Sequence, residues 1–189
     1  MSGSSAGVQT VSASVERARI FAMRSFGDYT TPGGRTFNEQ IAHAEEVAEL
    51  VREAGGSDEE IVAAWLHDVV EDARVYLAII ERQFGEEVAH IVSGLTDDPH
   101  MAGLPILERK QRQADKLWPK GIKVKRPKLA DQISNIRQIA RDPPAHWDRR
   151  KCRDYIRGAW MVAHACAGVS PLLDQYFIEA YDIAVSTHG

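Results

Sequence analysis

Apolar residues recur with the period of an α-helix along almost the whole of this 189-residue chain, and no segment alternates as a β-strand does. Helices are therefore expected over nine segments, which glycine, proline and short polar stretches separate. These segments are residues 15–26, 38–54, 57–73, 75–85, 86–98, 104–118, 126–142, 146–168 and 172–186. The pattern predicts an all-α fold, a single bundle of about eight or nine helices.

Local signals mark where some of these helices begin. Ser57 or Asp58 is expected to cap the third helix, because both side chains accept hydrogen bonds from free backbone N–H groups. Ser170 and Pro171 supply an N-cap and a first helical residue for the last helix. The connections between helices are short, which favours one compact domain.

Composition limits what the domain does. The net charge is −4, and no apolar run approaches the roughly 20 residues that span a bilayer, so neither a nucleic-acid nor a membrane partner is expected. The two cysteines, Cys152 and Cys166, lack the spacing of a metal site and favour a reducing, cytoplasmic location. Residues 1–14 are expected to be a flexible tail, residues 15–189 one domain, and residues 27–36 a loop.

The stretch AAWLHDVVED, residues 63–72, places four ionisable side chains in an apolar run: His67, Asp68, Glu71 and Asp72. Burying unpaired charge is costly, so the pattern needs a reason. On a helix, residues four apart lie above one another, which would gather all four over one turn. Imidazole and carboxylate together can bind a divalent cation, which offsets the cost of burial. A surface helix with acids near its end is the alternative.

Two further segments carry side chains of the same kind. His43 lies in the middle of an amphipathic helix, and Asp131 lies beside apolar residues with Asn135 one turn onward. Taken alone, His43 could be an ordinary core histidine and Asp131 a capping or exposed acid. Together with His67 and Asp68 they form the order His, His-Asp, Asp along an all-α chain, which is far more specific and predicts a metal site.

This order resembles that of the HD-domain metal-dependent phosphohydrolases. The segments IVAAWLHDVVEDA, FGEEVAHIVSGLTDD, LERK and KLADQISNIRQI are similar to the hydrolase half of the RelA/SpoT alarmone enzymes. The match is closest to the stand-alone small alarmone hydrolases, including the metazoan SpoT homologues, and runs from about residue 16 to 185. The resemblance implies an all-α enzyme that uses one manganese ion to remove the pyrophosphate from the 3′ position of (p)ppGpp.

The resemblance also implies a role for each matching residue. The metal ligands would be His43, His67, Asp68 and Asp131. Glu71 and Asp72 would position and deprotonate the attacking water. The contacts to a nucleotide substrate would come from Arg24, Lys110, Asn135, Lys151 and Tyr155. Two imidazoles and two carboxylates, without a thiolate, suit one Mn²⁺ or a similar divalent ion.

Charge and departures from the family pattern bear on the substrate. Nine of the 23 basic residues fall between Arg109 and Lys128; most are expected to be solvated, while Lys110 in the ERK motif is expected to reach phosphates. The family's HxGQxR loop reads SFGDYT here, so Arg35 is a candidate for the lost charge. The open alternatives are an adenine alarmone, another HD phosphohydrolase (a 5′-nucleotidase or NADPH phosphatase), and a non-catalytic nucleotide-binding module. The oligomeric state also stays open.

Overall fold

The structure is a computed structural model that describes residues 12–27 and 35–189. Within these ranges it contains nine α-helices, one 3₁₀-helix at Pro99–Met101 and no strand. The α-helices are α1 Ala13–Phe26, α2 Phe37–Glu53, α3 Asp58–Leu66, α4 Leu77–Phe84, α5 Glu86–Leu95, α6 Ile106–Leu117, α7 Ile122–Arg141, α8 Arg149–Cys166 and α9 Pro171–His188. The predicted all-α fold of eight or nine helices is confirmed.

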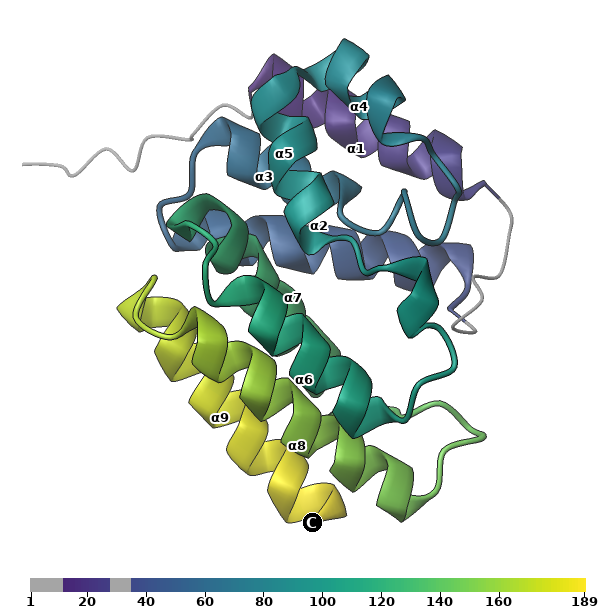
Figure 1. The fold of residues 1–189 in the computed structure, drawn as a ribbon, viewed down its shortest axis with the longest axis vertical. Coiled ribbons are helices and arrows are strands. Elements are labelled where there is room, and N and C mark those ends of the chain that lie inside the picture. Colours follow the sequence, from purple (N-terminus) through teal and green to yellow (C-terminus); the bar gives the residue numbers. More distant parts are fainter. Residues whose placement is uncertain (1–11, 28–34) are drawn as a thin grey trace, which may run out of the picture.

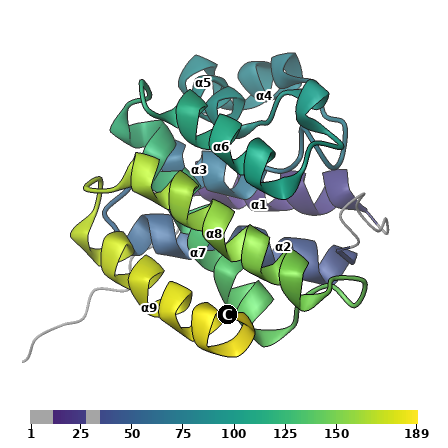
Figure 2. The ribbon, with the colours of Figure 1, turned by 60° about the horizontal axis from the view of Figure 1, so that its bottom comes forward.

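Helix α7 joins two groups of helices. It packs against α2, α3 and α5 on one side and against α8 and α9 on the other. Figure 1 shows α1 to α5 in the upper part of the molecule and α8 and α9 in the lower part. In Figure 2, α6, α8 and α9 lie along one another, and contacts join α6 to α8 and α8 to α9. Side chains of α7 therefore reach the interior between the two groups.

The helix starts follow the sequence signals. The hydroxyl of Ser57 accepts from the N–H of Glu60, and the Glu60 carboxylate accepts from the N–H of Ser57, a reciprocal pair that closes the first turn of α3. Ser170 caps α9 by accepting from the N–H of Leu173, and Pro171 is the first helical residue. Both predicted caps are confirmed.

Helix α3 is shorter than predicted, which corrects the geometry expected for the residues from His67 to Asp72. The regular helix ends at Leu66 instead of residue 73, and the N–H of Val69 bonds to the carbonyl of Leu66 in a tighter turn. Two adjacent β-branched residues, Val69 and Val70, favour this departure because they restrict side-chain rotamers in a helix. His67 to Asp72 thus lie on successive turns and not on one regular helical face.

Two other boundaries also differ from the prediction. Helix α7 begins at Ile122, four residues before the predicted start, so that Pro127 lies inside the helix and removes only one backbone N–H. Helix α1 begins at Ala13, two residues before the predicted domain boundary. Residues 1–11 of the predicted tail and residues 28–34 of the predicted loop lie outside the described residues. Within the described ranges, no helix has both the length and the hydropathy needed to cross a bilayer.

Candidate metal centre

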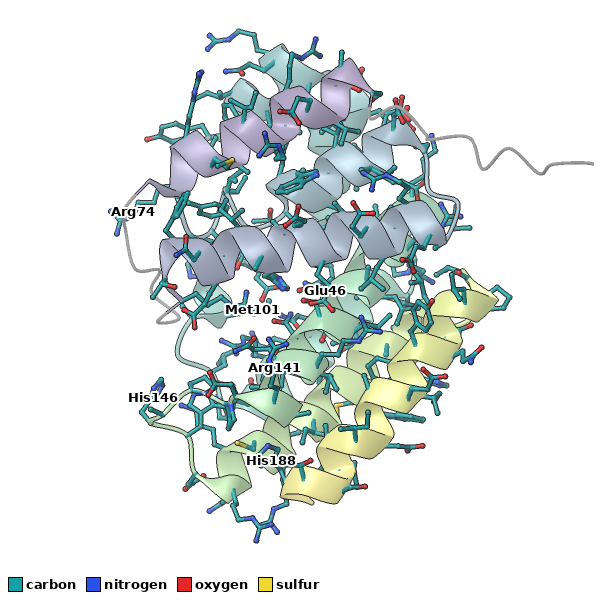
Figure 3. All side chains as sticks on the ribbon, turned by 180° about the vertical axis from the view of Figure 1, so that it is seen from behind. Glu46, Arg74, Met101, Arg141, His146 and His188 are labelled. Atoms are coloured by element: carbon teal, nitrogen blue, oxygen red, sulfur yellow. The ribbon has the colours of Figure 1, made fainter. Side chains whose placement is uncertain are left out.

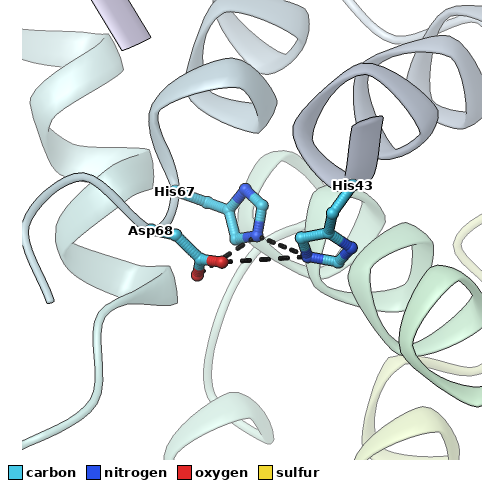
Figure 4. A group of neighbouring side chains, drawn as sticks. All are labelled: His43, His67 and Asp68. Carbon is cyan, nitrogen blue, oxygen red and sulfur yellow. Dashed lines mark hydrogen bonds and ion pairs between the residues drawn. The ribbon is translucent and has the colours of Figure 1, made fainter. Parts of the chain in front are cut away.

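Three helices bring the four predicted ligands to one point. His43 comes from the middle of α2, His67 and Asp68 follow the end of α3, and Asp131 comes from α7. His43, His67 and Asp131 are buried, and Asp68 is partly buried. Figure 4 shows the two imidazole rings and the Asp68 carboxylate turned toward one another. These residues are 88 positions apart at the extremes, so only the folded bundle unites them.

The distances between the ligand atoms suit a single ion. The Nε2 atoms of His43 and His67 are 3.2 Å apart, and His67 Nε2 lies 3.2 Å from an Asp68 oxygen. Asp131 Oδ1 lies 3.4 Å from His43 Nε2 and 3.8 Å from His67 Nε2. Two donors that bind one ion at about 2.1 Å are themselves roughly 3.0–3.4 Å apart. His43, His67 and Asp68 therefore offer ligand atoms that all lie within 4.8 Å of one another, as a divalent metal requires, and Asp131 reaches both histidines.

The hydrogen bonds behind the imidazoles fix which nitrogen faces the centre. His67 Nδ1 lies 2.7 Å from the carbonyl oxygen of Ala64, so this nitrogen carries the proton and donates it. His43 Nδ1 lies 2.8 Å from the hydroxyl oxygen of Ser134, which in turn donates to Glu46 at 2.6 Å. Since the Ser134 proton is directed to Glu46, His43 Nδ1 must be the donor. Both Nε2 lone pairs then point into the centre.

A positive charge is needed between these lone pairs. Burial would lower the pKa of His67, but the neighbouring Asp68 carboxylate outweighs burial and raises this pKa to about 9. Burial lowers the pKa of His43, and the positive charge of Arg35 lowers it further. Without an ion, a proton on His67 supplies positive charge between the two carboxylates. A divalent cation would replace that proton and accept a lone pair from each of the four side chains.

Both carboxylates of the centre are ionised. Burial would raise the pKa of Asp131, but Lys128, whose Nζ lies 3.0 Å from Oδ2, holds it well below the usual value. Burial would raise the pKa of Asp68, but the positive charge and the hydrogen bond of His67 outweigh burial and lower it. The amides of Gln132 and Asn135 donate to the two oxygens of Asp131 and fix its orientation. Two negative charges favour a divalent over a monovalent cation.

The predicted catalytic pair, Glu71 and Asp72, is held from two different sides. Asp72 accepts from the amide of Gln40 at 2.6 Å, and the same amide lies 3.4 Å from Asp68, which links Asp72 to the centre. Burial raises the pKa of Asp72 to about 6, and the charge of Asp68 adds to the rise. Glu71 is exposed and accepts from the N–H of Asp97 at 2.6 Å. Partial desolvation raises the pKa of Glu71 as well.

A cavity of about 560 Å³ opens beside Asp72. Its walls include Arg35, Asn135, Trp147 and Tyr155. The Arg35 guanidinium lies 3.6 Å from Asp68 and donates to Asn135, so the cavity adjoins the metal centre. Two predicted substrate contacts, Asn135 and Tyr155, are thus brought together.

The other three predicted substrate contacts lie in different surroundings. Lys151 does not line the cavity; its Nζ lies 5.0 Å from the ring centre of Trp147, which does. Lys110 is 3% exposed, donates to Gln132 at 2.8 Å and lies over the Tyr155 ring, so it supports the wall from behind. The structure does not bring Arg24 to the centre: it lies in a groove between α1 and α4.

Sequence reasoning missed four residues that complete the site. They are Gln40, Glu46, Ser134 and Trp147. Figure 3 shows Glu46 between α2 and α7, where the Arg137 guanidinium also donates to it at 2.9 Å. Spacing offered a signal for two of them: Gln40 and Ser134 stand three positions from a proposed ligand.

The chain is similar to proteins of known family and fold. A model of the HD-domain family matches residues 18–160. The guanosine-3′,5′-bis(diphosphate) 3′-pyrophosphohydrolase MESH1 of Xenopus tropicalis is 35% identical over 136 residues, which cover 71% of this chain and 74% of that protein. The protein of the same name from Danio rerio is 34% identical over 145 residues, which cover 74% and 79%.

A solved structure has the same fold. It is described as a metazoan ortholog of SpoT that hydrolyzes ppGpp and plays a role in starvation responses. It matches with a TM-score of 0.79 at 24% sequence identity and covers 93% of this chain and 97% of that chain. Since the family match spans most of the sequence and the relatives share about a third of its residues, the chain belongs to the HD-domain family, in the branch that contains the MESH1 proteins.

Proposed function

We propose that this protein is a metal-dependent pyrophosphohydrolase that removes the 3′-pyrophosphate from (p)ppGpp or from a related alarmone such as ppApp. The observation that carries the proposal is the convergence of two imidazoles and two carboxylates at 3.2–3.8 Å, next to a cavity of about 560 Å³. The names of the related proteins support the substrate class.

We propose Mn²⁺ as the ion, held by His43, His67, Asp68 and Asp131, because imidazole and carboxylate ligands without a thiolate suit it. When bound, a divalent ion lowers the pKa of water and polarises a phosphoryl oxygen. The chain's own residues prepare the ligands: Ala64 and Ser134 fix the imidazole tautomers from behind. The unpaired, buried thiols of Cys152 and Cys166 fit the proposed cytoplasmic location.

Glu71 and Asp72 supply the acid–base chemistry in this proposal. Glu71 takes the proton from the attacking water, since a carboxyl of raised pKa is a better base near neutral pH than an ordinary glutamate. Asp72 orients the reactants, and the Gln40 amide holds it in place.

The cavity beside Asp72 would receive the nucleoside. Trp147 and Tyr155 offer aromatic faces, with ring centroids 5.3 Å apart, against which a purine base can pack. Arg35 and Asn135 lie between these rings and the centre, where the ribose phosphates would pass. Lys151, above Trp147, adds positive charge at the rim.

The test is to incubate the protein with ppGpp, ppApp and NADPH in parallel, each with Mn²⁺ and with EDTA, and to measure released pyrophosphate and phosphate. The proposal expects pyrophosphate from at least one alarmone, only with metal. Phosphate from NADPH or simple nucleotides, with no pyrophosphate from either alarmone, would assign the chain to a phosphatase branch. No turnover of any substrate, with retained nucleotide binding, would indicate a non-catalytic module.

A further inference from the structure

The Glu71 carboxylate is held by a single backbone group. Its Oε1 accepts from the N–H of Asp97 at 2.6 Å, and no other hydrogen bond or ion pair within the described ranges fixes this carboxylate. Glu71 lies in the turns that follow α3, and its side chain is exposed. A long side chain of this kind has several rotamers in water, so its direction depends on the Asp97 N–H.

The end of α5 makes that N–H available. The helix ends at Leu95, and Thr96 donates its own N–H to the carbonyl of Val92. Thr96 then adopts an extended conformation, with φ −69° and ψ 131°. The next N–H, that of Asp97, leaves the helical ladder and points outward. The position of residues 96–98 therefore decides where Glu71 is held.

Helix α6 fixes these residues with two side chains one turn apart. The amide of Gln113 donates to Asp97 Oδ2 at 2.5 Å, and Gln113 is 7% exposed. Lys116 donates to the carbonyl oxygen of Thr96 at 2.5 Å and to that of Ser93 at 3.2 Å. Because the partner of Gln113 is a carboxylate, the amide must present its N–H₂ group to it.

We propose that Gln113, assisted by Lys116, is a positioning residue that acts through Asp97 to aim the Glu71 carboxylate. This inference rests on the proposed function, in which Glu71 takes the proton from the attacking water. Gln113 is neither a proposed metal ligand nor a residue of the cavity wall; it fixes the segment whose N–H holds the base. Its loss should therefore lower kcat and leave KM and metal affinity unchanged.

The variant Gln113→Met keeps the length of the side chain and removes the donor. A displaced base should lower kcat by roughly 10- to 100-fold, because small misplacements of a reacting group are costly. The matched control is Gln111→Met on the same helix, where an exposed glutamine bonds to Asp115 at 2.9 Å. The control should retain the wild-type kcat.

A reversal of polarity separates positioning from general damage. Gln113→Glu alone would face the Asp97 carboxylate with a second carboxylate and should lower kcat at least as much as Gln113→Met. Adding Asp97→Asn to Gln113→Glu restores one donor and one acceptor across the contact and should return kcat to near the wild-type value. The double variant also decides the question if Gln113→Met fails to fold.

A readout without substrate distinguishes failure of this inference from failure of the proposed function. The amide proton of Asp97, bonded to a carboxylate, should resonate downfield in an NMR spectrum. Glu71→Gln and Gln113→Met should both move it upfield, and Gln111→Met should not. Wild type without pyrophosphohydrolase activity would contradict the proposed function. An unmoved Asp97 resonance in Gln113→Met, an unchanged kcat, or a double variant that fails to recover would overturn the positioning role.

Discussion

Removing the Ser134 hydroxyl tests whether the groups behind His43 prepare it for an ion. Ser134 is 2% exposed, and its Oγ both accepts from His43 Nδ1 at 2.8 Å and donates to Glu46 at 2.6 Å. Ser134→Ala breaks both bonds. His43 would then be free to carry its proton on Nε2, the nitrogen that faces the centre, where the proton would compete with the metal.

The size of the effect follows from these two bonds. Loss of a group that orients a ligand histidine weakens metal binding by roughly 10- to 100-fold, or about 1.4–2.7 kcal/mol. The fold itself should lose about 1–3 kcal/mol in the absence of metal, because a buried donor and part of a carboxylate lose their partner. A purely structural role for Ser134 would lower the stability by this amount and leave the Mn²⁺ affinity of the folded protein unchanged.

Isothermal titration with Mn²⁺ measures the affinity, and urea denaturation in EDTA measures the stability. The matched control is Ser186→Ala, where an exposed hydroxyl on α9 donates to the carbonyl of Asp182 at 2.8 Å. Glu46→Gln should have a smaller effect than Ser134→Ala, because its remaining carbonyl oxygen can still accept from the hydroxyl. Wild-type Mn²⁺ affinity in Ser134→Ala would refute the reasoning about the tautomer of His43.

Three further substitutions have defined expectations. Glu71→Gln should keep wild-type Mn²⁺ affinity and lower kcat by about 10²–10⁴-fold, since a general base is lost; a retained rate would move that role to another residue. Gly158→Ala would place a Cβ 2.5 Å from Lys110 Cγ. This overlap should lower the free energy of unfolding, measured in urea, by about 1–3 kcal/mol. Wild-type stability would show that the lysine side chain moves aside freely. In the structure, the two carboxylate oxygens of the buried Glu60 lie 2.5 and 2.7 Å from Arg126 Nη1. Arg126→Met leaves this carboxylate without its cation and should lower the free energy of unfolding by about 3–5 kcal/mol in the same assay.

An exposed ion pair offers a matched control for Arg126→Met. Arg112 on α6 pairs with Glu108 at 2.7 Å, and both side chains are about half exposed. Arg112→Met should change the free energy of unfolding by less than about 1 kcal/mol. If the two arginine variants lost similar stability, burial of the Glu60 pair would not be the reason for its importance.

The sequence predicted well what depends on local patterns. The apolar period predicted the helices, and the caps at Ser57 and Ser170 followed from residue type and position. The order of His43, the His67-Asp68 pair and Asp131 also predicted which side chains the structure brings together. A ligand set is readable from sequence when its residue types are costly to bury in any other arrangement.

Long-range partners could not be predicted in the same way. Ser134 and Glu46 are 88 positions apart, so the spacing that sets Ser134 one turn from Asp131 does not indicate its hydrogen bond to Glu46. The burial of Lys110 could not be predicted from the sequence either, because it depends on the space that Gly158 leaves on the facing helix α8. The end of α3 at Leu66 was missed because the apolar period continues through Val69 and Val70, and their weak helix propensity alone does not fix where a helix ends.

Most of the basic run between Arg109 and Lys128 has structural partners. Lys116 and Lys125 bond to backbone carbonyls, and Lys123 pairs with Glu87. The expectation that most of these cations are solvated is therefore only partly right: Arg112 and Lys123 are exposed, whereas Lys110 and Lys128 are buried. Outside this run, Arg35 lies beside both Asp68 and the cavity, where it can supply positive charge to the phosphates.

The most direct test of the account is to measure bound Mn²⁺ per chain and pyrophosphate release from ppGpp on the same samples of wild type, Asp68→Ala and the exposed control Asp182→Ala. We expect one ion per chain and metal-dependent release for wild type and control, with both lost in Asp68→Ala. Release of pyrophosphate by Asp68→Ala without bound metal would contradict the assignment of the centre.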